Sequence, residues 1–293
     1  MNSVKERAYA KINLFLDVID KREDGFHSVR TVMHSLSLCD ELTVTVTGKG
    51  PRAVKVILVG KRKLPLDSKN IAVMAALMFM ETACIDCEVT IKLHKKIPIA
   101  AGLAGGSADA AAVLRAMNKL FSRPLSDKML LALAARLGSD VPFCLIGGTA
   151  LCEGRGERMT RLRDGISLHA VIAVANEWVS TPKAYAKLDL LYNNFDGSVP
   201  TESHEICDRI VEAATTGVLP DKLYNIFEAA TLPDCPKAEA IKARLNELGA
   251  THTLMSGSGP SVFGIFSTEQ MARAAEETLR GEDIFAVYAC SVK

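Results

Sequence analysis

Residues 98–114 constrain the fold of this chain strongly, because glycine and alanine dominate them: P-I-A-A-G-L-A-G-G-S-A-D-A-A-A-V-L. We expect a loop that runs into a helix. Glycine takes positive φ at little cost and lets a ligand approach the backbone, which is open to Gly102, Gly105 and Gly106. Ser107 stands where a helix cap is expected. The apolar face of the expected helix follows at helical spacing, through Val113, Met117 and Leu120.

The N–H groups at the start of a helix bind anions, most often phosphate. The residues alone leave two interpretations open: a phosphate-binding loop, or a tight packing turn between a strand and a helix. A P-loop is excluded, because it has Lys and then Ser or Thr after its last glycine, whereas Ser107 and Ala108 follow Gly106. A dinucleotide fingerprint beginning at Gly102 is excluded too, because Ala104 and Ser107 stand where glycine is needed.

The composition is that of a globular chain that can build a sizeable core, with 293 residues, 48% of them apolar and 24% charged. A net charge of +1 argues against a nucleic-acid-binding protein. The longest apolar run, residues 71–80, is too short to cross a bilayer, and residues 1–7 are polar and charged, unlike a secretory signal. We therefore expect a cytoplasmic protein without nucleic-acid or membrane partners.

Eight cysteines are scattered along the chain. Cys84 and Cys87 have C-x-x-C spacing, but a zinc site would need a second pair of ligands. We interpret both as ordinary buried thiols, since cysteine is among the most buried residue types, and the whole set as typical of a reducing compartment.

Residues 8–18 alternate cleanly and predict a strand. One face is apolar, and the other carries Tyr9, Lys11 and Asn13. A lysine and an asparagine two residues apart on one face could hold a phosphate or a hydroxyl group. A solvated outer face is the alternative, and this segment taken alone favours it.

The remaining pattern predicts an α+β fold, in which helices pack on one side of a mostly antiparallel sheet. Residues 42–47 and 54–59 are expected to form a hairpin, and residues 194–202 a loop. The charged segment 153–163 is expected to be a loop that separates domains 1–158 and 159–293. Further strands are expected at residues 88–93, 168–175, 251–255, 261–266 and 284–291. Helices are expected at residues 70–82, 126–136, 181–190, 206–214, 224–230, 238–248 and 268–279.

Three separated segments resemble the motifs of the GHMP small-molecule kinases, in the family's order along the chain. They are residues 11–16, the glycine-rich segment 98–111, and the G-S-G-containing segment 255–263. The family's second motif usually reads P-x-x-x-G-L-G-S/G-S-S-A. This chain departs from it at Ala104, where glycine is usual, and at Ala108, where serine or another small residue is usual. The resemblance implies a two-domain kinase, with a ribosomal-S5-domain-2-like N-terminal domain, a ferredoxin-like C-terminal domain and an active site in the cleft between them.

Within the family, the chain is similar to the branch that phosphorylates a cytidine diphosphate derivative of methylerythritol in the non-mevalonate route to isoprenoids. The similarity lies in A-Y-A-K-I-N-L-F-L at the start, D-G-F-H at 24–27, L-G-S-D-V-P at 137–142 and M-S-G-S-G-P at 255–260. It implies transfer of the γ-phosphoryl group of ATP to a hydroxyl of that substrate. Homoserine and mevalonate kinases of the same family remain an alternative, as does a nucleotide-binding protein without activity, which would be expected to lack Lys11 or Asp140.

The resemblance also implies site residues. Asp140 would be the general base, and Lys11 would lie beside it and stabilise charge. Phe26 and Tyr185 would sandwich the cytosine ring, which His27 would hydrogen-bond. Asn13 and Thr181 would complete the substrate site, and Mg²⁺ would be held mainly by ATP phosphates and water. The ATP site would comprise Asn70, Lys95, Pro98, Ile99, Ala100, Ala101, Gly102, Leu103, Ala104, Gly105, Gly106, Ser107 and Ala108. We expect a monomer or a weak homodimer.

Overall fold

The computed structural model describes residues 2–60, 64–67, 69–195 and 201–292. The chain divides into two compact units, each made of several chain segments. Unit 1 comprises Met1–Ala10, Cys39–Ile99 and Ala104–Ile146, and unit 2 comprises Lys11–Leu38, Ala100–Leu103 and Gly147–Lys293. The compact units are discontinuous in sequence and do not follow the predicted division between residues 158 and 159. That division stays a prediction.

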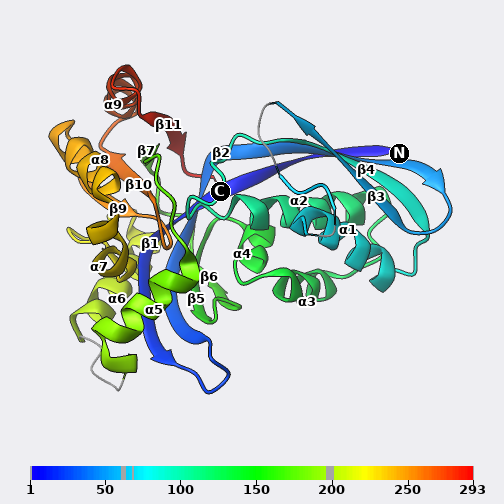
Figure 1. Ribbon diagram of the computed structural model, residues 1–293, viewed down its shortest axis with the longest axis horizontal. Coiled ribbons are helices and arrows are strands. Elements are labelled where there is room, and N and C mark those ends of the chain that lie inside the picture. The colour runs from blue at the N-terminus through cyan, green and yellow to red at the C-terminus, as the bar shows by residue number, and fades with distance from the viewer. Residues whose placement is uncertain (1, 61–63, 68, 196–200, 293) are drawn as a thin grey trace. The chain divides into compact units, whose positions relative to one another are not determined.

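Unit 1 places helices on one face of its strands (Figure 1). The sheet runs in the order β3-β4-β2-β1-β8, of which this unit holds the start of β1, the end of β2, and all of β3 and β4. These strands are β1 (Ser3–Lys21), β2 (His27–Lys49), β3 (Ala53–Val59) and β4 (Cys87–His94). The helices are α1 (Ile71–Thr82), α2 (Gly105–Leu120), α3 (Asp127–Leu137) and α4 (Val141–Ile146).

The predicted hairpin between residues 42–47 and 54–59 is wrong. Both strands form, but β4 lies between them, antiparallel to β2 and parallel to β3. Three linking residues extend about 10 Å, which spans two inter-strand spacings of about 4.8 Å. A short connection therefore does not require the strands that it joins to pair directly.

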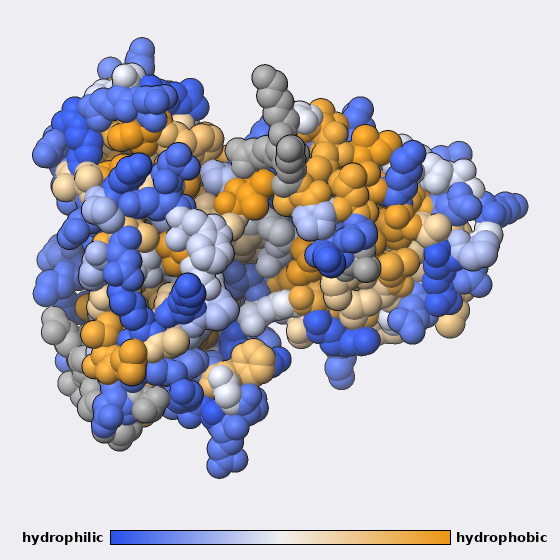
Figure 2. Space-filling model, in the orientation of Figure 1, coloured by the Kyte–Doolittle hydropathy of each residue, from blue (hydrophilic) through white to orange (hydrophobic). Residues whose placement is uncertain are grey.

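The helices of unit 1 begin and end largely where the sequence predicts. Asn70 caps α1 by accepting a hydrogen bond from Ala72 N, and Ser126 caps α3 by accepting one from Met129 N. Gly138 ends α3, as expected. Met74 on α1 and Met129 on α3 stay partly exposed, and apolar side chains are visible on the surface of this unit (Figure 2).

Unit 2 contains a four-stranded antiparallel sheet in the order β11-β7-β10-β9, together with the rest of β1 and β2. Its further strands are β5 (Thr149–Gly154), β6 (Arg158–Arg161), β7 (His169–Val174), β8 (Tyr224–Asn225), β9 (His252–Met255), β10 (Ser261–Phe266) and β11 (Phe285–Cys290). Its α-helices are α5 (Thr181–Leu191), α6 (Thr201–Thr216), α7 (Phe227–Thr231), α8 (Pro236–Glu247) and α9 (Glu269–Gly281). Two short 3₁₀ helices are Asn193–Phe195 and Leu232–Asp234.

Two predictions in unit 2 need correction. The charged segment 153–163 is not an open loop, because β6 pairs antiparallel with β5 there. Residues 224–230 are not one helix, because Tyr224 and Asn225 pair in parallel with Phe15 and Leu16 of β1 before α7 begins. Of the predicted loop 194–202, residues 196–200 lie outside the described residues, and Thr201 begins α6.

The core of unit 2 combines residues from both ends of the chain. Leu16, Val18 and Val29 of β1 and β2 pack in one apolar cluster with residues of β7, β10, β11 and the helices. Two mostly antiparallel sheets with packed helices confirm the α+β prediction. Within the described ranges, we find no helix that combines the length and apolar character needed to cross a bilayer.

Candidate active site

The glycine-rich loop takes a different conformation from the one expected. Gly102 has a positive φ of +76°, as its sequence suggests. Two alanines of the loop also adopt positive φ, Ala100 at +52° and Ala104 at +56°. Helix α2 begins at Gly105 with Ala104 as its N-cap residue. Ser107 is thus the third residue of the helix, and the expectation that it caps the helix is wrong. Gly105 and Gly106 take helical rather than left-handed conformation.

The first turn of α2 offers backbone donors. Ala108 N donates to Ala104 O at 2.8 Å, which is the first hydrogen bond of the helix. The N–H groups of Gly105, Gly106 and Ser107 precede it and have no carbonyl one turn earlier within the helix. Gly106 is exposed, and its two neighbours are half-buried. This geometry suits an anion such as a phosphate group.

The start of the loop, Ala100–Leu103, belongs to unit 2 and contacts the G-S-G segment closely. Gly102 O accepts a hydrogen bond from Ser256 Oγ at 3.0 Å, and Ser261 Oγ donates to Ala101 O. A Cβ atom on Gly102 would lie 2.1 Å from Ser256 O. Glycine is needed at position 102, because a Cβ atom would collide with Ser256 O and the positive φ would add backbone strain.

Lys11 and Asn13 are buried in β1, with relative exposures of 3% and 1%. The solvated outer face that their alternation left open is therefore wrong. Lys11 Nζ donates to Asn13 Oδ1 at 2.7 Å and to Gly102 O at 3.0 Å. Asn13 Oδ1 also accepts from Gly257 N at 3.0 Å. The three sequence motifs thus meet in one hydrogen-bonded network inside unit 2.

Asn225 anchors the same network from β8. Its Nδ2 donates to Met255 O at 2.7 Å and to Gly257 O at 2.8 Å, and its Oδ1 accepts from Phe227 N. The sequence analysis missed Asn225, because residues 224–230 were expected to be helical. On the exposed side, Thr181 Oγ1 lies 2.8 Å from Ser258 Oγ, so this predicted substrate residue contacts the G-S-G segment.

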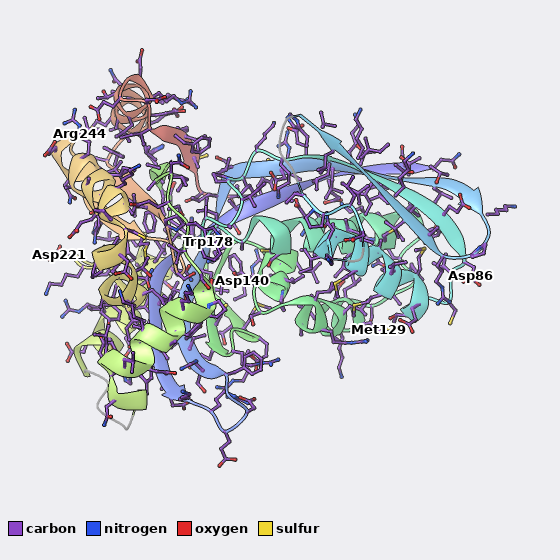
Figure 3. The ribbon with its side chains drawn as sticks, in the orientation of Figure 1. Asp86, Met129, Asp140, Trp178, Asp221 and Arg244 are labelled. Atoms are coloured by element: carbon purple, nitrogen blue, oxygen red, sulfur yellow. The ribbon has the colours of Figure 1, made fainter. Side chains whose placement is uncertain are left out.

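Asp140 lies in unit 1, immediately before α4 (Figure 3). It is half-buried, and its carbonyl accepts from Cys144 N at 3.0 Å in the first turn of that helix. Gly138 ends α3 two residues earlier, so a short turn between two helices presents the carboxylate. Its role as a base stays a prediction.

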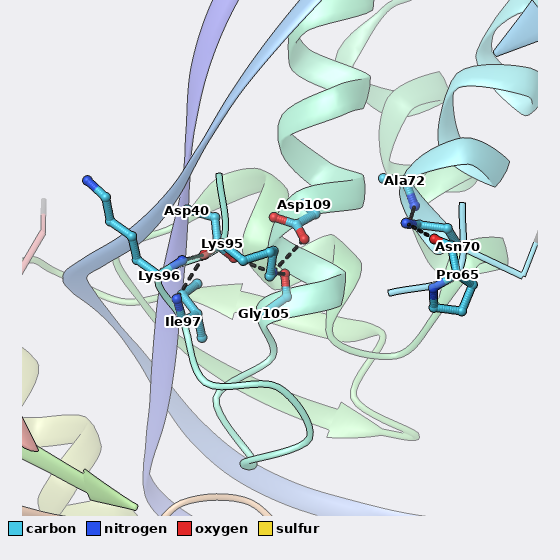
Figure 4. A network of polar contacts seen from close by, with 9 residues as sticks. All are labelled: Asp40, Pro65, Asn70, Ala72, Lys95, Lys96, Ile97, Gly105 and Asp109. Carbon is cyan, nitrogen blue, oxygen red and sulfur yellow. Dashed lines mark hydrogen bonds and ion pairs between the residues drawn. The ribbon is translucent and has the colours of Figure 1, made fainter. Parts of the chain in front are cut away.

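Lys95 takes part in a buried ionic cluster under the first turn of α2 (Figure 4). Its Nζ pairs with Asp40 of β2, with Asp109 of α2 at 2.6 Å, and with Gly105 O at 3.3 Å. Asp40 Oδ1 accepts from the backbone N–H groups of Lys96 and Ile97. Burial raises the pKa of Asp109 to about 8, against the opposing effect of the Lys95 ammonium.

This cluster ties the end of β4 to the first turn of α2. Contact of Lys95 with the nucleoside of ATP stays a prediction, and its ammonium is already engaged by the two carboxylates. Asn70, the other predicted nucleoside residue, donates to Pro65 O at 2.9 Å besides capping α1 (Figure 4). The sequence analysis missed Asp40 and Asp109, although an aspartate within an alanine run was a usable signal.

The predicted cytosine residues are only partly brought together. The rings of His27 and Tyr185 stack with centroids 4.6 Å apart, and His27 Nε2 lies 2.7 Å from Asp189 Oδ1. Phe26 is 55% exposed and has the guanidinium of Arg155 at 4.8 Å from its ring centroid. Burial raises the pKa of Asp189, but the bonds from Lys21 and His27 outweigh it and hold that pKa below its usual value.

Within the part of the chain that the structure describes, no group of three or more His, Cys, Asp or Glu side chains is arranged to hold a metal ion. The eight cysteines are free thiols. Cys87 is buried, as predicted, and Cys84 is exposed, which corrects the expectation for that residue. Cys84 lies in the turn after α1, where its φ is +53°.

Comparison with known proteins identifies the family. The profile for the GHMP kinases N terminal domain matches residues 70–148, and that for the GHMP kinases C terminal domain matches residues 201–282. The chain is 40% identical over 283 residues to a 4-diphosphocytidyl-2-C-methyl-D-erythritol kinase of Acetivibrio thermocellus, covering 97% of both chains. The chain belongs to the GHMP kinase family.

Solved structures agree with this assignment. A crystal structure of a 4-(cytidine 5'-diphospho)-2C-methyl-D-erythritol kinase matches with a TM-score of 0.81 and 34% identity, over 99% of this chain and 100% of that one. A homoserine kinase of Cytophaga hutchinsonii matches with a TM-score of 0.76 at 22% identity, over 100% and 95% of the two chains, and shares the fold. The resemblance of the three motifs to GHMP kinases is thereby confirmed.

As a GHMP kinase, this chain keeps its second motif with two departures, Ala104 and Ala108. Ala104 holds the left-handed conformation that glycine, the usual residue of the motif, would adopt without strain. Ala108 is buried and accommodated within α2. The alanine at position 104 thus leaves the path of the loop intact and stores some strain at the start of the helix.

Proposed function

We propose that this chain transfers the γ-phosphoryl group of ATP to the 2-hydroxyl of 4-diphosphocytidyl-2-C-methyl-D-erythritol, in the non-mevalonate route to isoprenoid precursors. The observation that carries the proposal is 40% identity to a kinase of that name along 97% of both chains. The homoserine and mevalonate alternatives are not favoured, because the homoserine kinase match is one of fold at 22% identity.

In the proposed reaction, Asp140 accepts the proton of the 2-hydroxyl as its oxygen attacks the γ-phosphorus of ATP. The bond between the γ-phosphorus and the bridging oxygen breaks, and ADP leaves with the electron pair of that bond. A tertiary alcohol is a weak nucleophile, so a carboxylate in hydrogen-bond reach contributes roughly 10²- to 10⁴-fold in rate. Lys11 stabilises the negative charge that develops on the transferring group.

The N–H groups of Gly105, Gly106 and Ser107 at the start of α2 are proposed to bind the ATP phosphates. Asn70 and Lys95 are proposed to lie near the nucleoside, and residues 98–104 are proposed to line the ATP site. Mg²⁺ is proposed to bind mainly to the phosphates and water, which suits its reluctance to lose hydration, and to neutralise phosphate charge when bound.

The cytidine end of the substrate is proposed to bind at Phe26, His27, Thr181 and Tyr185, with Asn13 contributing on the acceptor side. Tyr185 already stacks on His27, so a bound cytosine ring would either replace this contact or extend the stack toward Phe26. Aromatic faces with a few fixed polar groups are typical of small-molecule sites. Asp189, which holds His27 Nε2, would help to fix the imidazole orientation.

We further propose that the enzyme acts in the cytoplasm as a monomer or a weak homodimer, on a small-molecule substrate and without nucleic-acid or membrane partners. The eight free thiols support a reducing compartment, and the net charge of +1 supports the absence of a polyanionic partner.

A coupled assay for ADP release tests the proposal. The purified chain with ATP and Mg²⁺ would be supplied in turn with the cytidine substrate, homoserine and mevalonate. ADP release with the cytidine substrate alone is expected. ADP release with one of the other alcohols would identify a different kinase of the family, and nucleotide binding without turnover of any substrate would point to the non-catalytic alternative.

A further inference from the structure

We infer that Thr31 is a positioning residue for the kinase reaction, which sets the orientation of the Asn13 amide and through it the position of the Lys11 ammonium. This inference rests on the proposed function, in which Lys11 touches the transferring phosphoryl group. Thr31 lies on β2, is 1% exposed and belongs to unit 2, as do Lys11 and Asn13.

The direction of the Thr31 hydroxyl follows from its partners. Thr31 Oγ1 lies 2.5 Å from Phe15 O, and a carbonyl oxygen accepts only, so the single hydroxyl proton points to Phe15. Thr31 Oγ1 is then left as an acceptor toward Asn13, whose Nδ2 donates to it at 2.8 Å. The main chain of β1 thereby decides which end of the Asn13 amide faces Thr31.

The other end of the amide faces two donors. Asn13 Oδ1 accepts from Lys11 Nζ at 2.7 Å and from Gly257 N at 3.0 Å. An ammonium and a backbone N–H both require an acceptor there, so the amide has one satisfactory orientation. Oxygen and nitrogen of an asparagine are otherwise close in shape, so the orientation is held by the two donors at one end together with the Thr31 acceptor at the other.

Without that hydroxyl, the amide loses the acceptor that holds its nitrogen. If the amide turned over, its NH₂ group would face the Lys11 ammonium and Gly257 N, and these donors would separate. Lys11 would then lose its contact with Asn13, and the G-S-G segment would lose its link to β1 at Gly257. Because catalysis depends on placement to within about 1 Å, a shift of this kind lowers the rate roughly tenfold to a hundredfold.

The test compares Thr31→Val, which keeps the shape and removes the hydroxyl, with Thr31→Ser, which keeps the hydroxyl and removes the methyl group. Thr149→Val is the matched control, because Thr149 is equally buried and its hydroxyl bonds His34 Nδ1 at 2.8 Å rather than the Asn13 amide. Each protein is assayed for kcat and for KM of ATP and of the cytidine substrate, and its thermal unfolding midpoint is recorded.

We expect kcat of Thr31→Val to fall roughly tenfold to a hundredfold with both KM values within about threefold, and Thr31→Ser to restore kcat to within about threefold of the unaltered enzyme. Thr149→Val should lower the unfolding midpoint. At assay temperatures where this variant stays folded, its kcat should equal that of the unaltered enzyme. Equal loss of kcat in Thr31→Val and Thr149→Val, or normal kcat in a folded Thr31→Val, would overturn the inference.

A second readout guards against a Thr31→Val protein that does not fold. In that case Thr31→Ser and Thr31→Ala are compared, and the inference requires kcat to follow the hydroxyl rather than the unfolding midpoint. If the unaltered chain fails to phosphorylate the cytidine substrate, the proposed function fails. If it succeeds and the hydroxyl makes no difference, only the positioning role of Thr31 fails.

Discussion

Replacing Asp140 by asparagine keeps the size of the side chain and removes the base. We expect kcat of Asp140→Asn to fall by roughly 10² or more, with KM for ATP and the cytidine substrate changed no more than a few-fold, because the loss lies in proton transfer. Steady-state kinetics of the folded variant measure this. Asp127→Asn at the exposed start of α3 is the control, and near-normal turnover by Asp140→Asn would remove Asp140 from the mechanism.

Tyr185 is expected to bind the cytosine ring by stacking, which is worth roughly 1–3 kcal/mol per base in nucleic-acid binders. Tyr185→Ala should therefore raise the KM for the cytidine substrate about tenfold or more and leave the KM for ATP nearly unchanged. Tyr185→Phe keeps the ring and should behave almost as the unaltered enzyme. A rise in the ATP KM alone would assign Tyr185 to the phosphoryl donor.

His34 should make the stability of the protein depend on pH. Burial lowers the pKa of His34 to about 4, from 6.5, while Asp164 acts weakly in the opposite direction. The folded state favours the neutral ring, which bonds Thr149 and Ser291. Its contribution is therefore fully present above pH 6.5 and is lost as the pH falls through 4, by about 3 kcal/mol in total.

Urea denaturation at a series of pH values measures this dependence. The free energy of unfolding of the unaltered protein should fall more steeply between pH 6.5 and 4 than that of His34→Gln, whose side chain does not titrate. Parallel curves for the two proteins would show that His34 titrates alike in the folded and unfolded states.

At the scale of elements, the loop before α2 offers a paired prediction. Ala104→Gly should raise the free energy of unfolding by about 0.5–1 kcal/mol, because an alanine in left-handed conformation costs about 1–2 kcal/mol and glycine returns part of this as chain entropy. Gly102→Ala should lower it by several kilocalories per mole, because its Cβ would lie 2.1 Å from Ser256 O.

Chemical denaturation of both variants gives the sign of each effect. The unaltered protein supplies the reference, and ATP titration of Ala104→Gly shows whether relief of the strain alters nucleotide binding. The prediction requires the free energy of unfolding to rise in Ala104→Gly and to fall in Gly102→Ala. A Gly102→Ala protein as stable as the reference would mean that the loop can move away from Ser256.

The sequence predicts elements well where the signal is local. Ser126 and Gly138 mark the two ends of α3 because a cap and a stop act through adjacent backbone groups. It fails at β3, whose partner β4 comes later in the chain, and at Ser107, because Ala104 sets the start of α2 through a conformation that alanine does not signal.

The candidate site shows the same limit. The motifs name Lys11, Gly102 and the G-S-G segment, but alternation alone could not place Lys11 and Asn13 inside the protein. Their partners Gly102 and Gly257 lie 91 and 244 residues away along the chain, respectively. Thr31 carries no motif, and its role emerges only from the direction of one hydroxyl group.

At the scale of the molecule, unit 2 is expected not to fold without the first strands of the chain. Its core includes Leu16, Val18 and Val29, and His34 Nε2 bonds Ser291 Oγ near the C-terminus. A fragment of residues 159–293, the predicted C-terminal domain, lacks the three apolar core residues and the imidazole that bonds Ser291. It should show no cooperative unfolding transition by circular dichroism and should be cleaved rapidly by protease.

Adding residues 11–38 as a separate peptide provides the complementary experiment. Partial recovery of protease resistance is expected, since this segment supplies β-strand partners and core side chains. A fragment of residues 159–293 that unfolds cooperatively by itself would establish it as an independent domain and would support the predicted boundary.

The mixed origin of unit 2 also has a consequence for how the protein is made. The ribosome synthesises residues 11–38 early, whereas their partners in Gly147–Lys293 follow only after all of unit 1 has been synthesised. At about 5–20 residues per second, these apolar strands wait roughly 10 to 50 s for the last of their partners. During that interval they are a natural substrate for chaperones, and slower translation of the second half of the message should lower the yield of soluble enzyme.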